Sequence, residues 1–120
     1  MHAFLLIAHG SRREASNNEV RHLALEISKE AGDIFDLLEC CFLELANPLI
    51  PAAIRDLAQK GVKKITVFPY FLAVGAHVAE DIPDAINEAK VCYPEIDFLI
   101  LPHLGKMKSM PRLIIEQITD

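Results

Sequence analysis

The first apolar run of the chain has no polar position on either face. Residues 3–8 read Ala-Phe-Leu-Leu-Ile-Ala, and the run stops at His9-Gly10-Ser11. A short continuous apolar segment that ends in Gly and Ser predicts a strand buried on both faces, as in a parallel sheet. Because ligands of open α/β sheets bind outside the carboxyl ends of the strands, we expect His9 to lie at the binding edge.

The rest of the chain alternates between helix-like and strand-like patterns. Apolar runs predict further strands at residues 35–43, 62–68 and 96–101. Apolar positions at helical spacing predict helices over 14–31, from Asn47-Pro48 to Gly61, after His77, and from Pro111 onward. We expect Asn47 to cap the second helix, with Pro48 at its first position.

Two details of the later helices also follow from the pattern. Pro83 is tolerated only near a helix start, so the third helix is expected to begin later than His77. The last helix is expected to carry Leu113, Ile114 and Ile118 on one apolar face.

Four strand–helix repeats with short connections predict an α/β fold, in which a parallel sheet is flanked by helices. A length of 120 residues without a linker or repeat predicts that residues 1–120 form a single domain. The common strand order for this pattern is 2-1-3-4, as in a flavodoxin-like half, with the switch point between the first and third strands.

Polar residues follow each predicted strand: His9, Glu44, His77 and His103. Because parallel strands end at one edge of a sheet, we expect His9 and His77 to flank the switch-point crevice, with Glu44 beside His9. Two imidazoles and a carboxylate suit a divalent ion such as Co²⁺, Ni²⁺, Fe²⁺ or Zn²⁺. So few protein ligands would leave open positions on the ion, as reactive metal sites do.

These residues also have structural interpretations. A carboxylate at a helix start, such as Glu44 or Asp81, can simply stabilise the helix dipole. Asp81 could instead orient His77, because the two are four residues apart. The apolar loop of residues 68–75 could close the core or form a wall for a flat ligand. His2 and His22 are interpreted as structural or surface residues.

Composition excludes several classes of function. A net charge of −5 and a pI near 5.5 argue against a nucleic-acid partner. No apolar run approaches the ~18 residues of a membrane span and no signal peptide is evident, so we expect a cytoplasmic protein without membrane contact. Cys40, Cys41 and Cys92 lack CxxC spacing and predict no disulfide framework. The absence of G-x-G-x-x-G after the first strand removes a dinucleotide-binding interpretation.

Specific motifs carry a family resemblance over nearly the whole chain. They are Leu-Leu-Ile-Ala-His-Gly-Ser-Arg at 5–12, Cys-Phe-Leu-Glu at 41–44, Val-Phe-Pro-Tyr-Phe-Leu at 67–72, and Gly-Ala-His-Val-Ala-Glu-Asp-Ile-Pro at 75–83. In these segments the chain resembles the short-form sirohydrochlorin cobaltochelatases, which are class II chelatases that need no ATP. The resemblance implies a chelatase-like fold and metal insertion into sirohydrochlorin in tetrapyrrole biosynthesis of the cobalamin or sirohaem type.

The resemblance also implies roles for residues. His9 and His77 would handle the metal and accept protons, with Glu44 at the same site. The ion, Co²⁺ or in relatives Ni²⁺ or Fe²⁺, would be a substrate, and no fixed cofactor is expected. Substrate contacts are expected at Ser11, Arg12, Tyr70, Phe71, Leu72, Val74, Gly75 and Ala76. Larger members resemble two such units, so a homodimer is expected, with the clefts of the two subunits facing each other across the macrocycle.

The sequence also leaves other functions open. The chain could be a metal or tetrapyrrole carrier without turnover. Phosphoryl transfer through His9 is disfavoured, because Ala8 stands where histidine phosphatases place an arginine. The substrate carries many carboxylates, whereas this chain is net negative. Arg12 and Arg13 could bind such anionic groups, or could begin a solvated helix.

Overall fold

β1 is the strand around which the sheet is built. The computed structural model describes residues 1–119, and its four strands are all parallel in the order β2-β1-β3-β4. The elements are β1 (His2–Ala8), α1 (Glu14–Ala31), β2 (Leu37–Phe42), α2 (Ile50–Gln59), β3 (Lys64–Pro69), α3 (Ala76–Cys92), β4 (Asp97–Ile100), the 3₁₀ helix η1 (Leu104–Lys106) and α4 (Met110–Glu116). The expected α/β class and strand order are confirmed.

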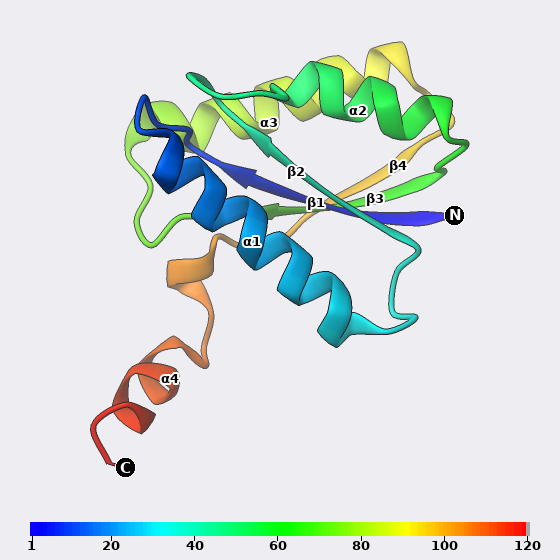
Figure 1. Cartoon of the computed structure of the whole chain (residues 1–120). Coiled ribbons are helices and arrows are strands. Elements are labelled where there is room, and N and C mark those ends of the chain that lie inside the picture. The colour runs from blue at the N-terminus through cyan, green and yellow to red at the C-terminus, as the bar shows by residue number, and fades with distance from the viewer. Residues whose placement is uncertain (120) are drawn as a thin grey trace.

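The apolar run of β1 is buried because both of its faces are covered. α1 lies over one face of the sheet, and α2 and α3 lie over the other (Figure 1). Leu5 and Ile7 point into a core shared with α2 and α3, whereas Leu6 points into a smaller core beneath α1. All three side chains have no exposed area. Fully burying a Leu or Ile side chain contributes ~1.5–3 kcal/mol, so the central strand is strongly fixed.

The predicted start of the second helix was wrong. Asn47-Pro48 is a cis peptide ahead of the helix, and Phe42 N–H donates to the Pro48 carbonyl at 2.9 Å. Leu49, in extended conformation, forms a parallel bridge with Phe42. The segment therefore prolongs the pairing of β2, and the helix begins at Ile50, where Pro51 occupies the first turn.

The predicted late start of the third helix was also wrong. α3 begins at Ala76 and continues through Pro83. A proline inside a helix has no N–H to donate to the carbonyl four residues earlier, here that of Ala79. α3 nevertheless buries Ile82 and Ile86 against the sheet. We attribute the persistence of the helix to this burial, which offsets the missing hydrogen bond.

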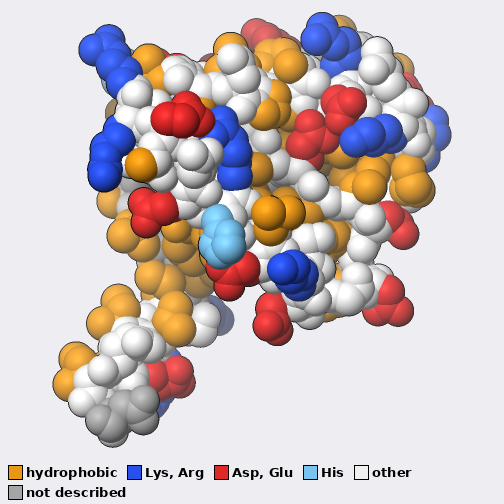
Figure 2. All heavy atoms as spheres, in the orientation of Figure 1, with side chains coloured by type: hydrophobic (Ala, Val, Ile, Leu, Met, Phe, Trp, Pro, Cys, Tyr) orange, Lys and Arg blue, Asp and Glu red, His pale blue; other side chains and the backbone are white. Residues whose placement is uncertain are grey.

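α4 stands away from the sheet, beside η1 (Figure 1). The predicted helix at Pro111 exists, but it ends at Glu116, so Ile118 lies beyond it. The predicted apolar face covers nothing in the described chain: Leu113, Ile114 and Ile118 are all exposed. In Figure 2 hydrophobic side chains gather on this C-terminal segment, at the lower left.

Candidate functional site

His9 directly follows β1, and the backbone around it brings Glu44 alongside. Leu43 N–H donates to the Ala8 carbonyl at 2.9 Å, and Glu44 N–H donates to the His9 carbonyl at 3.1 Å. The pairing thus continues to Glu44, two residues beyond the end of β2, and to His9, one residue beyond the end of β1. The result is a His9 Nε2 to Glu44 Oε1 distance of 3.8 Å, with side chains 53% and 61% exposed.

His77 reaches the same edge of the sheet from β3. Tyr70 N–H donates to the Ile7 carbonyl at 2.8 Å, which holds the exit of β3 against the end of β1. The loop then crosses to Gly75, whose carbonyl accepts from Ala79 N–H at 3.0 Å and so begins α3. His77 is the second residue of that helix.

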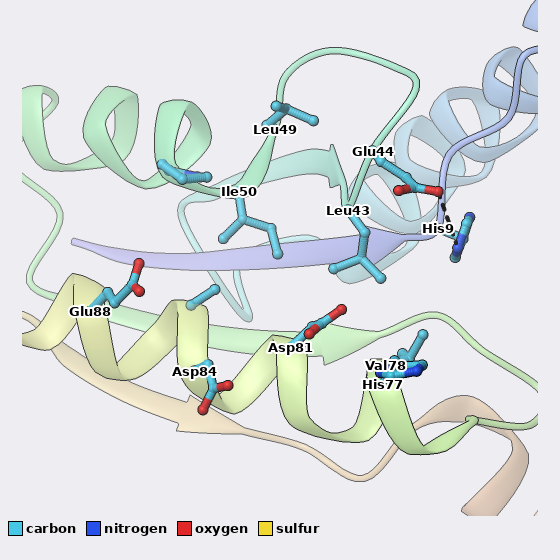
Figure 3. Close-up of a pocket in the computed structure, with 12 residues that line it drawn as sticks. His9, Leu43, Glu44, Leu49, Ile50, His77, Val78, Asp81, Asp84 and Glu88 are labelled. Atoms are coloured by element: carbon cyan, nitrogen blue, oxygen red, sulfur yellow. Dashed lines mark ion pairs between the residues drawn. The ribbon is translucent and has the colours of Figure 1, made fainter.

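His9, Glu44 and His77 line one cleft of about 450 Å³ at the carboxyl edge of the sheet (Figure 3). The complete lining is His9, Leu43, Glu44, Leu49, Ile50, Pro51, His77, Val78, Asp81, Asp84, Ala85 and Glu88. The topology argument from sequence placed these three residues at one edge, and the structure brings them into one cavity. His103, before η1, lies outside this lining.

The cleft carries a strong negative bias. Four carboxylates, Glu44, Asp81, Asp84 and Glu88, accompany the two imidazoles, and no Lys or Arg among the described residues lines the cavity. A concave surface lined by one sign of charge raises the local concentration of counter-ions. The cavity therefore favours a cation over an anion.

Sequence reasoning missed Asp84 and Glu88. Together with His77 and Asp81 they recur every three or four residues and so share one face of α3, as Figure 3 shows along the helix. The spacing was visible in the sequence, but such a stripe is normally a solvated helix face. It becomes part of a cleft because α2 lies beside α3.

The donor groups line the cavity without converging on one point. Within residues 1–119 no group of three His, Cys, Asp or Glu side chains is close enough to hold a metal ion. Asp81 shares the helix face of His77 as expected, and the described residues show no hydrogen bond between the two. An ion held here by one or two protein groups would keep most positions for water or another ligand.

Several expected substrate residues lie outside this cavity. Ser11 serves the start of α1: its Oγ accepts from Arg13 N–H at 3.0 Å, and its N–H donates to Asn17 Oδ1 at 2.9 Å. Tyr70 and Phe71 are half-buried against the two cores. Leu72 is 70% exposed, so its apolar side chain is open to a ligand.

The two histidines set aside from the sequence are engaged elsewhere. His2 Nε2, on β1, lies 2.7 Å from Thr66 Oγ1 on the neighbouring strand β3. His22 Nε2 lies 2.9 Å from Glu26 on the surface of α1. Neither lines the cleft. Among residues 1–119 no helix is long and apolar enough to cross a membrane.

Fold and cleft together define the class: an α/β protein whose strand ends present imidazole and carboxylate groups to an acidic cavity. The family model of CbiX matches residues 3–120. The chain belongs to the CbiX family.

Relatives and solved structures agree with this assignment. The sirohydrochlorin cobaltochelatase of Methanococcus maripaludis is 41% identical over 87 residues, which are 72% of this chain and 59% of that protein. The sirohydrochlorin cobaltochelatase of Sulfurisphaera tokodaii is 29% identical over 120 residues, covering all of this chain and 93% of the relative. The sirohydrochlorin chelatase SirB of Bacillus subtilis subspecies spizizenii, solved in complex with cobalt, superposes with a TM-score of 0.85 at 26% identity, over 99% of this chain and 50% of that one.

Proposed function

We propose that this protein inserts a divalent metal ion, first of all Co²⁺, into sirohydrochlorin without ATP. The observation that carries the proposal is the joint placement of His9, His77 and Glu44 in one acidic cleft of a CbiX-family chain. Relatives named as sirohydrochlorin cobaltochelatases support Co²⁺ as the ion. Other relatives are named as sirohydrochlorin ferrochelatases, so Fe²⁺ is the second candidate. Ni²⁺ is the third candidate, since imidazole accepts all three ions.

The reaction exchanges protons for metal. One M²⁺ enters the ring, two pyrrole N–H protons leave, and the macrocycle keeps its charge balance. His9 and His77 bind the ion as neutral imidazoles or accept the released protons, because an imidazole nitrogen can serve as a metal ligand or as a proton acceptor. Glu44, 3.8 Å from His9, offsets the charge of the ion and is a second proton acceptor.

The carboxylates of α3 have a role before insertion. Asp81, Asp84 and Glu88 extend from His77 along the cavity wall. In the proposed scheme they attract the hydrated ion and pass it toward the two histidines. Ions held loosely by carboxylates and water can exchange, which suits a metal that is a substrate and leaves with the product.

The macrocycle must approach from outside the acidic cavity, because its own carboxylates would be repelled inside it. We place it over the opening, with its charged rim toward Arg12, the Ser11 hydroxyl and the N–H group of Ala76, and its flat face toward the loop of Tyr70, Phe71, Leu72, Val74 and Gly75. The exposure of Leu72 supports an apolar contact there.

A homodimer belongs to the same proposal. The chain spans 50% of the SirB chain and 59% of the Methanococcus relative, so longer proteins add material next to this unit. We propose that a second copy supplies that neighbour and that α4, with Leu113, Ile114 and Ile115 exposed, packs against it. Exposed apolar patches of this kind mark interaction surfaces.

The test is metal insertion followed by the ultraviolet–visible spectrum of sirohydrochlorin with Co²⁺. We expect catalysis well above the protein-free rate, and a loss of at least about 100-fold in His9→Ala and His77→Ala. His22→Ala, on the surface of α1, is the matched control and should keep the wild-type rate. Wild-type rates in both cleft variants would contradict the assignment.

The same assay separates an enzyme from a carrier. With protein at one hundredth of the sirohydrochlorin concentration, an enzyme converts the whole pool. A carrier stops at one equivalent per site, and that outcome would replace the proposed activity with metal or tetrapyrrole binding.

A further inference from the structure

Gly10, between the histidine and the serine of the first loop, occupies a position that no other residue fits. Its φ is +95°, in the left-handed region that residues with a side chain rarely adopt. A Cβ atom built at this position would lie 1.8 Å from the Glu44 carbonyl oxygen and 3.0 Å from the Glu44 carbonyl carbon. These are backbone atoms, which cannot rotate away as a side chain would.

This close approach sits at the junction between the two site residues. Glu44 N–H donates to the His9 carbonyl at 3.1 Å, and the Glu44 carbonyl packs against the Cα of Gly10. Glu44 is therefore held through both its backbone N–H and its backbone C=O group. A side chain at position 10 would push the β1 and β2 exits apart and separate His9 from Glu44.

Gly10 also contacts the His9 ring directly. His9 Nδ1 lies 3.0 Å from the Gly10 carbonyl oxygen. A carbonyl oxygen only accepts, so Nδ1 carries the hydrogen in this bond. In a neutral imidazole the lone pair is then on Nε2, which is the nitrogen 3.8 Å from Glu44.

We propose that Gly10 is a positioning residue of the site: its carbonyl fixes His9 as the Nδ1–H tautomer, and its missing side chain lets Glu44 close on Nε2. Nε2 is thereby the His9 atom that binds the cation. The ligand rests on the proposed function, whereas the tautomer and the backbone contact rest on the geometry alone. Partners that orient a metal-binding histidine in this way typically change metal affinity 10–100-fold when altered.

The first test uses the unaltered protein. Imidazole ¹⁵N shifts of His9, assigned by comparison with His9→Ala and recorded where the ring is neutral, report which nitrogen is protonated. We expect a protonated Nδ1 and a bare Nε2. A protonated Nε2, or an even mixture of tautomers, would overturn the proposal.

The second test compares Gly10→Ala with Gly61→Ala. Gly61 has a similar φ of +87°, but a Cβ there meets nothing within 4 Å, so this variant isolates the backbone strain from the clash. Titration with Co²⁺ alone should show 10–100-fold weaker binding for Gly10→Ala and wild-type binding for Gly61→Ala. The His9 ¹⁵N spectrum should lose its single tautomer only in Gly10→Ala.

Equal Co²⁺ affinities in the two variants would contradict the role of Gly10. If Gly10→Ala does not fold, the wild-type tautomer decides alone. Failure of the proposed function would look different: the tautomer and the Gly10 effect on Co²⁺ would persist, while sirohydrochlorin would gain no metal.

Discussion

Glu39, on β2, is a carboxyl group outside the cleft whose pKa is shifted by its surroundings. Burial, together with a hydrogen bond from its carboxyl group to Asp56, raises the pKa of Glu39 to about 7. The Lys60 ammonium holds the pKa of Asp56 below its usual range. The two carboxyl groups and Lys60 thus form a small cluster that links β2 to α2.

The raised pKa of Glu39 predicts a pH dependence of stability. Between pH 4.5 and about 7 the folded protein holds a proton on Glu39 that the unfolded chain has released. The contribution of Glu39 to the free energy of unfolding is therefore fully present below pH 4.5 and is lost as the pH rises through about 7. Glu39→Gln removes this loss and should be more stable than wild type at pH 8, with little difference at pH 4. Urea unfolding across this range is the measurement, and parallel curves for the two proteins would contradict it.

The carboxylates of α3 give a second prediction at the scale of residues. Replacing Asp81, Asp84 and Glu88 together by Asn, Asn and Gln removes negative charge from the cavity but leaves both histidines. We expect the Co²⁺ concentration for half-maximal rate to rise roughly tenfold at low salt, with a smaller effect at high salt. Glu95→Gln, exposed after α3, is the control. A fall in the rate at saturating Co²⁺ instead would assign these groups to chemistry.

At the scale of elements, the loop after β3 is fastened to the C-terminal segment through Gly105. Its N–H donates to the Phe71 carbonyl at 3.0 Å. A Cβ at position 105 would lie 1.6 Å from the Leu72 carbonyl oxygen, which is again a backbone atom. The loop that we propose as the macrocycle wall is therefore braced by η1 rather than free.

Gly105→Ala should consequently destabilise the protein by about 1–3 kcal/mol through overpacking. Gly75→Ala is a suitable comparison, because its Cβ meets nothing within 4 Å and its φ is ordinary, so it should cost about 1 kcal/mol or less. Denaturant unfolding measures both. Equal losses of unfolding free energy in the two variants would show that the contact with Leu72 does not contribute to stability.

The elements also show what sequence can predict. The strand order and the meeting of His9, Glu44 and His77 followed from general rules for parallel sheets, because a fully apolar strand and its carboxyl end are local signals. The start of α2 was missed because Asn47-Pro48 pairs with β2, which is a contact distant in sequence. Asp84 and Glu88 were missed because only the packing of α2 beside α3 makes their helix face part of a cavity.

At the scale of the molecule, α4 stands apart from the sheet and makes the described chain less compact. The Cα radius of gyration is 14.7 Å, against roughly 13.6 Å expected for a compact chain of this length. A helix of seven residues is marginal in water without packing. Exposed Leu99 and Ile100 on the edge strand β4 add to the apolar surface that lacks a cover in the described chain.

The dimer proposal makes a prediction here. We expect sedimentation to give twice the mass of one chain for the wild type, and a monomer for Ile114→Asp with Ile115→Asp, because burying a charge at the interface is costly. Val91→Asp is the matched control, since Val91 is 82% exposed on α3. A monomeric wild type, or a double variant that still dimerises, would remove α4 from the interface.

The central place of β1 has a consequence for the timing of local motion. Its amides are bonded within a sheet and covered on both faces, so their hydrogens should exchange only when the whole domain opens. His9 stands one residue past that slowest-exchanging segment, whereas His77 stands in the first turn of a helix that begins after an exposed loop. One side of the site is thus anchored to the segment that should exchange most slowly, whereas the other side depends on the packing of α3 against the sheet and on the loop that η1 braces.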